Sequence, residues 1–288
     1  MTAATFTHTD LTPRFGSLVE ADRPTLLSGE HATELRQLLE QRSVVAIRGL
    51  EIDDAEQIAI SRTLGEVESS VVGDIYKVTF DKEQNPVGYA INKASFFWHI
   101  DRTDLDVPPF ASMLSAKVLT PTGGQTEFVN TYAAYEDLPE EDKERIEDIT
   151  VLHTIATAFL EAFPDPTERQ LAAWEHIPKK VHPLVWHHRS GRKSLVLSNS
   201  ATKVIGMDPE EGRALLSRLL AWSTQPQFVY VHEWQVNDLV IWNNTGAMHR
   251  VRDYDPDYGR MLHRTTLIGD EPFDTSGDTG EEPDAREG

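Results

Sequence analysis

The chain has 288 residues, of which 39% are hydrophobic and 26% are charged, and its formal net charge is −20. The hydrophobic fraction is ordinary for a globular protein, and the excess of acidic residues argues against a nucleic-acid surface, which needs clustered Lys and Arg. The chain has no cysteine, so disulfides, thiolate zinc sites and iron–sulfur clusters are excluded, and any metal must rest on His, Asp and Glu.

The two ends of the chain are polar. No apolar run approaches the ~20 residues that span a bilayer, and the first ten residues lack the pattern of a signal peptide, so we expect a cytoplasmic protein without a membrane partner. Residues 269–288 hold eight acidic residues against one arginine, with several Gly and Pro. We therefore predict one domain over residues 1–270 and an acidic, disordered tail over residues 271–288.

The first elements are a helix at 30–41, with Leu35, Leu38 and Leu39 at helical spacing, and a buried strand at 43–50. In chain order there follow a helix at 54–64, strands at 75–79, 87–91, 110–119 and 126–130, helices at 131–138, 140–149 and 164–175, a strand at 193–197, a helix at 210–222, and strands at 229–234, 238–242 and 262–268. Many short strands with Gly/Pro turns and a few peripheral helices predict an α+β, mainly β fold of the double-sheet jelly-roll type.

A short motif, Trp98-His99-Ile100-Asp101, is the first chemical signal. Residues i and i+2 of a strand face the same side, so His99 and Asp101 can converge on one ion. An imidazole and a carboxylate are two of the three ligands in the 2-His-1-carboxylate triad of non-haem Fe(II) oxygenases. His-x-Asp alone is a weak signal, because such pairs recur by chance.

A third ligand has to come from a distant segment, and His249 follows a predicted strand and a turn. Arg260 comes eleven residues later and Arg264 fifteen, and an arginine near the metal can bind the far carboxylate of a 2-oxo diacid bidentately. Considered alone, Thr126 reads as an ordinary threonine of a strand, and Arg260 reads as a solvated arginine at the surface.

Together these motifs resemble the taurine dioxygenase / 2,4-dichlorophenoxyacetate dioxygenase family of Fe(II)/2-oxoglutarate-dependent oxygenases. The resemblance runs from about residue 42 to residue 273 and is strongest over 98–101, 113–139 and 238–270. The family order of His-x-Asp, Gly-Gly-x-Thr, Trp-Asp/Asn-Asn with a following His, and then Arg and His-Arg is satisfied at the expected spacing.

The resemblance implies a double-stranded β-helix that uses Fe(II), 2-oxoglutarate and O2. The implied iron ligands are His99, Asp101 and His249. Thr126 and Arg260 would hold the distal carboxylate of 2-oxoglutarate, and Arg264 would contact either that co-substrate or an anionic substrate. The implied activity is oxidation of a C–H bond by hydroxylation, with C–O or C–N cleavage where the new hydroxyl lies beside a heteroatom.

We expect the substrate to be a small to medium organic molecule, preferably a carboxylate or sulfonate anion. The sequence is compatible with a homo-oligomer. Residues 71–97 lack the histidine with which the taurine enzymes bind the sulfonate, and residues 113–139 and 210–255 resemble the aryloxyacetate branch more closely. One alternative is a neutral hydrophobic natural product in a pocket lined by Ile75, Phe97 and Phe110. Another is a non-catalytic or zinc-binding jelly-roll protein, in which Thr126 and Arg260 would have no purpose.

Overall fold

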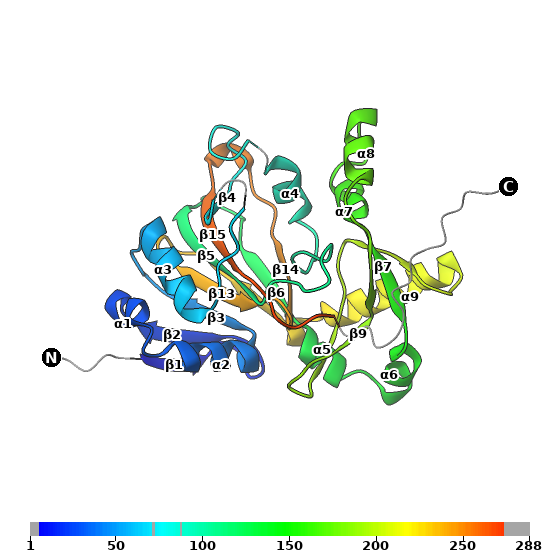
Figure 1. Ribbon diagram of the computed structural model, residues 1–288, viewed down its shortest axis with the longest axis horizontal. Coiled ribbons are helices and arrows are strands. Elements are labelled where there is room, and N and C mark those ends of the chain that lie inside the picture. The colour runs from blue at the N-terminus through cyan, green and yellow to red at the C-terminus, as the bar shows by residue number, and fades with distance from the viewer. Residues whose placement is uncertain (1–5, 71–72, 87, 274–288) are drawn as a thin grey trace.

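The structure of the protein, a computed structural model, describes residues 6–70, 73–86 and 88–273. It mixes helices with sheets, and most of the helices lie around the strands (Figure 1). Among the described residues, no helix combines the length and the apolar character needed to cross a membrane.

The largest sheet has seven strands in the order β1-β2-β3-β13-β5-β15-β4. Neighbouring strands pair antiparallel except β2 and β3, which run parallel. The strands are β1 (Phe6–Asp10), β2 (Ser17–Ala21), β3 (Val44–Ile47), β4 (Tyr76–Val78), β5 (Ala111–Val118), β13 (Leu239–Asn243) and β15 (Met261–Leu267). Because β3 and β13 are buried on both faces, they read as continuous apolar runs in the sequence.

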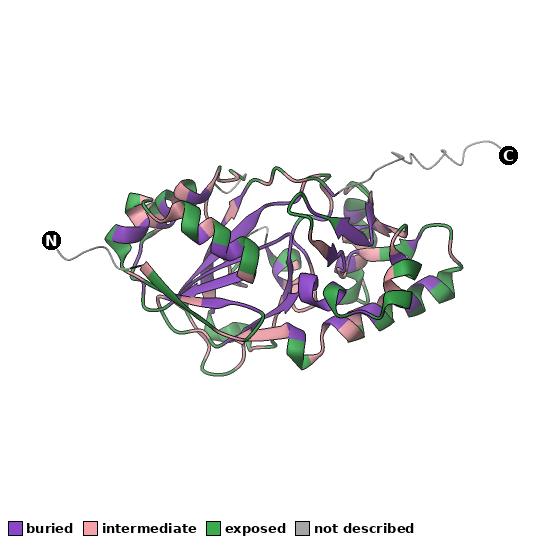
Figure 2. Ribbon diagram, turned by 90° about the horizontal axis from the view of Figure 1, so that it is seen from below, coloured by how far each residue is buried: buried purple, intermediate pink, exposed green. Residues whose placement is uncertain are grey.

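A second, three-stranded antiparallel sheet has the order β12-β6-β14, with β6 (Thr126–Asn130), β12 (Val229–His232) and β14 (Ala247–Val251). Phe128 of this sheet packs with Val240 and Trp242 of the large sheet in one apolar cluster. The opposite face of the large sheet is covered by α2 (Ala32–Arg42) and α3 (Asp54–Leu64). Figure 2 shows the resulting contrast between buried strands and helices that are exposed on their outer faces.

Local signals define the ends of several elements. Helix α3 has the predicted boundaries because Asp53 and Glu56 form a capping box, in which each side chain accepts a hydrogen bond from the other residue's backbone N–H. Helix α9 (Pro209–Ser223) begins with a proline and with Asp208 as its N-cap.

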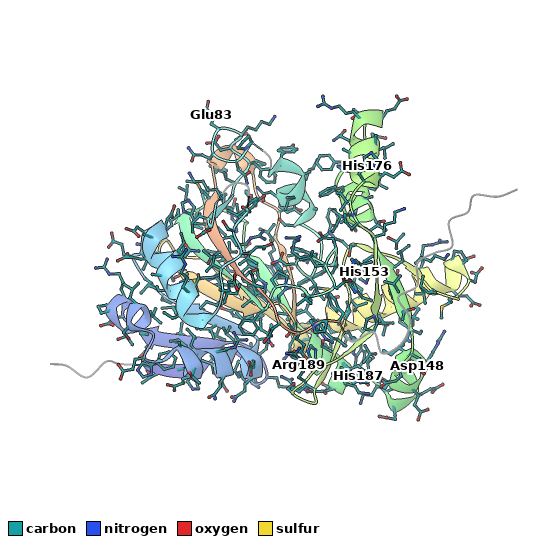
Figure 3. The ribbon with its side chains drawn as sticks, in the orientation of Figure 1. Glu83, Asp148, His153, His176, His187 and Arg189 are labelled. Atoms are coloured by element: carbon teal, nitrogen blue, oxygen red, sulfur yellow. The ribbon has the colours of Figure 1, made fainter. Side chains whose placement is uncertain are left out.

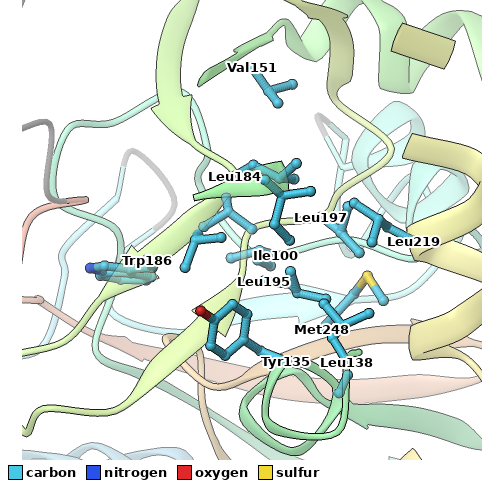
Figure 4. Packing of buried hydrophobic residues seen from close by; sticks show 14 of the residues in the cluster. Ile100, Tyr135, Leu138, Val151, Leu184, Trp186, Leu195, Leu197, Leu219 and Met248 are labelled. Carbon is cyan, nitrogen blue, oxygen red and sulfur yellow. The ribbon is translucent and has the colours of Figure 1, made fainter. Parts of the chain in front are cut away.

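Residues 131–223 build the other half of the molecule. Its strands are β7 (Thr150–His153), β8 (Lys180–Pro183) and β11 (Ala201–Val204) in one sheet, and β9 (Val185–His187) with β10 (Lys193–Leu195) in another. Its helices are α5 (Thr131–Glu136), α6 (Glu140–Ile146), α7 (Ile155–Ala162), α8 (Glu168–Glu175) and α9. Figure 4 shows the core of this half, where Leu184, Trp186 and Leu195 meet Leu219 of α9 and Met248 of β14.

One predicted element is wrong, and another begins later than predicted. The strand expected at 87–91 is helix α4 (Tyr89–Ala94), whose backbone carries the helical bond from Asn92 N to Gly88 O; Val87 lies outside the described residues. The single helix expected at 164–175 is α8, which begins at Glu168, and α7 precedes it unpredicted. Both segments are short, and α4 packs against α7, so tertiary contacts outweigh the local pattern.

Helix α1 (Arg23–Ser28) completes the described elements near the N-terminus, beside α3. At the other end, Phe273 is buried against His182 and Trp186, and Trp186 Nε1 donates to the carbonyl of Pro272. Residues 271–273 of the predicted tail therefore pack against the core, and the rest of that prediction, residues 274–288, lies outside the described residues.

Candidate metal centre

The backbone brings His99 and His249 together. They form an isolated antiparallel β-bridge, with His99 N donating to His249 O at 3.0 Å and His249 N donating to His99 O at 2.9 Å. The strand expected around His99 is limited to this bridge, because the chain turns at Asp101 and Arg102 adopts a left-handed φ of 58°. The bridge and the turn still direct the side chains of His99 and Asp101 to one place.

The potential ligand atoms converge. Asp101 Oδ1 lies 3.8 Å from His99 Nε2 and 3.9 Å from His249 Nε2, and ligand atoms of all three residues lie within 4.8 Å of one another. Transition metals bind such nitrogens and oxygens at about 2 Å, so two ligands of one ion are separated by up to about 4 Å. The three side chains are therefore spaced as ligands of a single ion.

The two imidazoles have the protonation state that a metal requires. His99 Nδ1 lies 2.8 Å from the carbonyl oxygen of Phe97, which only accepts, so Nδ1 carries the proton and Nε2 keeps its lone pair. Burial lowers the pKa of His99, and burial together with the neighbouring His99 lowers the pKa of His249 to about 3. Both rings are thus neutral near pH 7, as metal binding demands.

Asp101 is held by two residues that sequence reasoning missed. Ser112 Oγ donates to Asp101 Oδ2 at 2.9 Å, which leaves Oδ1 facing the two histidines. The Asn244 side chain accepts from Asp101 N at 3.0 Å and donates to Asp101 O at 3.1 Å. Burial acts to raise the pKa of Asp101, but Arg264, His249, His99 and Ser112 outweigh it and lower that pKa to about 2. Asp101 is therefore an oriented carboxylate.

A cavity of about 330 Å³ opens at these three residues and is also lined by Thr126, Arg260 and Arg264. All six residues singled out in the sequence thus share one cavity. Arg260 is 3% exposed, its Nη2 donates to Gly124 O at 2.8 Å, and its Nε has no hydrogen-bond partner. No Asp or Glu of the described residues forms an ion pair with Arg260, so a buried positive charge faces the cavity without a carboxylate.

Gly124 makes room for that arginine. This glycine belongs to the Gly-Gly-x-Thr motif, and a Cβ at Gly124 would lie 2.9 Å from Arg260 Nε and 3.1 Å from Arg260 Cδ. Nearby, Thr126 Oγ1 accepts a hydrogen bond from Trp234 Nε1 at 3.0 Å. Neither contact could be predicted from the spacing of motifs, because each joins residues that are distant in the sequence.

Arg264 is the cation nearest to the ligands. Its Nη1 lies 3.5 Å from Asp101 Oδ1, its guanidinium lies 4.9 Å from the centre of the Tyr76 ring, and its Nε has no hydrogen-bond partner. Arg260 precedes β15 and Arg264 lies within it, and both reach the cavity although the strand register shifts between Met261 and Leu262.

Other residues considered in the sequence lie elsewhere. Ile75, Phe97 and Phe110, the expected lining of a pocket for a neutral substrate, do not line the cavity, and Phe110 is buried under α2 and α3 instead. Figure 3 labels His176 beside α8 and His187 at the lower edge of the molecule, and neither residue lines the cavity of the candidate site. His153, also labelled there, forms a hydrogen bond between its Nδ1 and Ser200 Oγ at 2.8 Å.

Comparisons with known proteins agree with this geometry. Residues 7–266 match the family described as taurine catabolism dioxygenase TauD, TfdA family. The α-ketoglutarate-dependent 2,4-dichlorophenoxyacetate dioxygenase of Burkholderia sp. (strain RASC) is 35% identical over 84% of this chain and 87% of its own length. Pentalenolactone F synthase of Streptomyces arenae is 28% identical over 89% of this chain and 93% of its own. The crystal structure of AAD-2 in complex with Mn(II) and N-oxalylglycine has a TM-score of 0.80 and 33% identity, covering 93% of this chain and 99% of that one.

A His-Asp-His group with Asp101 and His249 buried, in a cavity with an arginine that makes no ion pair, defines a non-haem metal oxygenase site that takes an anionic co-substrate. The chain belongs to the TauD, TfdA family, and it is an α-ketoglutarate-dependent dioxygenase that uses Fe(II), 2-oxoglutarate and O2.

Proposed function

We propose that residues 1–270 form a single jelly-roll domain that oxidises a C–H bond of a small to medium organic anion, with Fe(II) held by His99, Asp101 and His249. The observation that carries this proposal is the position of Arg260, a buried cation without a carboxylate partner in the same cavity as three convergent ligands. The packing of the three-stranded sheet onto the seven-stranded sheet, through Phe128 and Trp242, supports the jelly-roll description.

The chemistry that Fe(II) supplies when bound is the activation of O2, coupled to conversion of 2-oxoglutarate to succinate and carbon dioxide. The protein supplies position and electrostatics. The Phe97 carbonyl fixes the tautomer of His99, while Ser112 and Asn244 fix the carboxylate of Asp101. Three protein ligands leave coordination positions open for a chelating 2-oxo acid and for O2.

Arg260 and Thr126 are proposed to bind the distal carboxylate of 2-oxoglutarate. The guanidinium is buried, and an uncompensated buried charge is costly, so the site favours a carboxylate there. Two other arginines of the cavity are paired with carboxylates that are not proposed metal ligands, Arg102 with Glu68 and Asp104, and Arg250 with Glu127. A non-catalytic or zinc-binding protein would have no use for a free buried Arg260.

Arg264 is proposed to bind the anionic group of the substrate. Among the described residues its one ion-pair partner is Asp101, itself a proposed metal ligand, and its Nε has no hydrogen-bond partner. The Burkholderia relative acts on 2,4-dichlorophenoxyacetate, a carboxylate, which supports an anion for this chain too. An arginine beside the metal site would hold the anion so that a neighbouring C–H bond lies close to that site, which is catalysis by positioning.

Anaerobic metal binding tests the assignment. Fe(II) with 2-oxoglutarate should produce a weak visible charge-transfer absorption, and His99→Ala, Asp101→Ala or His249→Ala should abolish both this absorption and turnover. Arg260→Ala removes a charge-assisted bond of about 1.5–3 kcal/mol, so the 2-oxoglutarate requirement should rise roughly 10- to 100-fold while iron still binds. Wild-type activity in any ligand variant, or an unchanged requirement in Arg260→Ala, would contradict the corresponding assignment.

A further inference from the structure

The turn after Asp101 is bonded to residues that do not line the cavity. Thr103, two residues further on, is 1% exposed. His182 Nε2 lies 2.8 Å from the carbonyl oxygen of Thr103, and because a carbonyl only accepts, Nε2 carries the hydrogen and donates it. The Thr103 hydroxyl forms a hydrogen bond with Ser200 Oγ at 2.8 Å. The carbonyl and the hydroxyl of Thr103 are thus both held by the other half of the molecule, from β8 and from the residue before β11.

His182 belongs to a buried polar cluster. The centre of its ring lies 5.2 Å from that of His153, and His153 Nδ1 forms a hydrogen bond with Ser200 Oγ at 2.8 Å. Strands β7, β8 and β11 form one sheet, and His153, His182 and Ser200 are each 1% exposed. Paired strands and close packing therefore fix the position from which His182 reaches Thr103.

Phe273, at the end of the described residues, covers His182. The centres of the two rings are 4.0 Å apart, and Phe273 is 3% exposed. Phe273 N donates to Asp106 O at 3.1 Å, and Asp106 lies in the turn region that begins at Asp101. Phe273 thus contacts both the histidine that holds the turn and the turn itself.

A strained residue makes this hold necessary. Arg102, between Asp101 and Thr103, has a φ of 58°, a left-handed conformation. This conformation costs a residue other than glycine about 1–2 kcal/mol, and it persists only where the surrounding structure fixes it. Asn244 fixes the backbone of Asp101 before the strained residue, and His182 fixes Thr103 after it. Without the second contact, Arg102 could relax and displace Asp101.

From this geometry we propose that His182 and Phe273 are positioning residues for the carboxylate of Asp101. His182 holds Thr103, Phe273 keeps the His182 ring in place, and neither residue lines the cavity. The affinity for Fe(II) then depends on a contact made near residue 273. This inference rests on the proposed function, in which Asp101 binds the metal, and adds two residues on which that binding depends.

Variants of His182 test the hydrogen bond. Fe(II) binding to the full chain is measured by anaerobic equilibrium dialysis without 2-oxoglutarate. His182→Phe keeps a ring against Phe273 but cannot donate to Thr103, so Fe(II) binding should weaken roughly 10-fold, as for residues that orient metal ligands. His182→Gln carries an amide N–H that can replace Nε2–H, so its affinity should return close to that of the wild type. Wild-type affinity in His182→Phe, or an equal loss in both variants, would overturn the role of this bond.

A matched pair of variants tests Phe273. Phe273→Ala should weaken Fe(II) binding roughly 10-fold, and its combination with His182→Phe should add little, because the two residues act as one unit. Phe228→Ala is the control, since Phe228 is 1% exposed in the same apolar cluster but packs against Trp222. It should leave the affinity unchanged at a temperature where circular dichroism shows each variant folded.

The corresponding leucine variants take their place if the alanine variants do not fold. Equal Fe(II) affinities of the Phe273 and Phe228 variants would overturn the role of Phe273.

Amide hydrogen exchange of the metal-free protein examines the turn without iron. Residues 101–106 should exchange faster in His182→Phe than in the wild type, because the turn opens more often once Thr103 is released. In His182→Gln the exchange should be close to that of the wild type. Unchanged exchange in His182→Phe would contradict the proposal.

Failure of the proposed function gives a different result. If Asp101 is not a metal ligand, Asp101→Ala binds Fe(II) as tightly as the wild type. If only the positioning inference is wrong, Asp101→Ala loses Fe(II), whereas His182→Phe and Phe273→Ala bind it with wild-type affinity.

Discussion

The indole nitrogen of Trp234 donates a hydrogen bond to the hydroxyl oxygen of Thr126 across 3.0 Å. A threonine hydroxyl has one hydrogen and can accept at its oxygen. With the indole occupying one acceptor position, the hydrogen of Thr126 is free to donate into the cavity that Thr126 lines. Trp234 is thus a positioning residue for the proposed 2-oxoglutarate clamp.

Replacing Trp234 with Phe should therefore raise the KM for 2-oxoglutarate roughly 5- to 30-fold with little change in kcat, since one hydrogen bond that orients a charge-binding group is lost. In a Thr126→Val background the same change should add almost nothing, because the two residues act as one unit. Steady-state kinetics of the four proteins measures this coupling.

Trp222→Phe is a matched control. Trp222 Nε1 donates to Ala134 O at 2.8 Å, away from the cavity, so its loss should lower stability by about 1 kcal/mol and leave the KM unchanged. Additive effects of the Trp234 and Thr126 changes would show that the hydrogen bond does not orient the clamp.

Gly124→Ala should weaken 2-oxoglutarate binding by about 10-fold or more, because the new Cβ presses on the Arg260 side chain. Gly191→Ala has a similar positive φ and no atom within 4 Å of the new Cβ. It should therefore reproduce only the backbone strain, of the order of 1–2 kcal/mol, without an effect on the co-substrate. Equal KM values in the two variants would exclude a role for the space at Gly124.

Asn244→Ala should weaken Fe(II) binding by roughly 10- to 100-fold, as changes in residues that orient metal ligands do. Both hydrogen bonds that Asn244 makes to the backbone of Asp101 are lost, so the carboxylate is less well placed. Equilibrium dialysis with Fe(II) under anaerobic conditions measures the effect, at a temperature where circular dichroism shows the variant folded. Wild-type affinity would indicate that Ser112 alone holds Asp101.

The buried His153 should make the protein less stable in mild acid. Burial, with a smaller contribution from His182, lowers the pKa of His153 to about 3. Its unfolded pKa is near 6.5, so the unfolded chain binds the proton first, and stability falls by about 1.4 kcal/mol per pH unit below that value. Only the unfolded state is protonated between about pH 6.5 and about pH 3, so the free energy of unfolding should decrease from pH 7 to pH 5.5.

His153→Gln should reduce this loss between pH 7 and pH 5.5 by about 1.4 kcal/mol, as measured by urea denaturation at the two pH values. His176→Gln, at an exposed position, should not change it. A pH dependence of His153→Gln identical to that of the wild type would mean that His153 is not the group responsible.

The sequence predicted elements well where local signals are strong. The boundaries of α3 and β6 match the prediction, since the first has a capping box and the second follows a Gly-Gly turn. Helix α4 was misread as a strand because its helical state depends on packing against α7, which no local pattern reveals. The mainly β fold was predicted from the number of short strands, but the pairing order of the seven-stranded sheet is set by contacts between distant segments.

The same division applies to the site. The candidate metal ligands and the two arginines could be predicted because they lie in motifs with fixed spacing, and the structure brings them to one cavity. Ser112, Trp234 and the space at Gly124 escaped notice because each acts on a partner far away in the sequence. The apolar residues of α4 and α7 that line this cavity were also missed, since they read as ordinary core positions.

The reciprocal backbone bonds between His99 and His249 have a consequence for how the protein matures. One histidine comes from the first half of the chain and the other from near its end, so this contact has a high sequence separation and forms slowly. A growing polypeptide holds only His99 and Asp101 until residue 249 has left the ribosome. With the proposed ligands, iron capture by the full set is therefore a post-translational event, and the bound metal would then link these two distant segments of the finished chain.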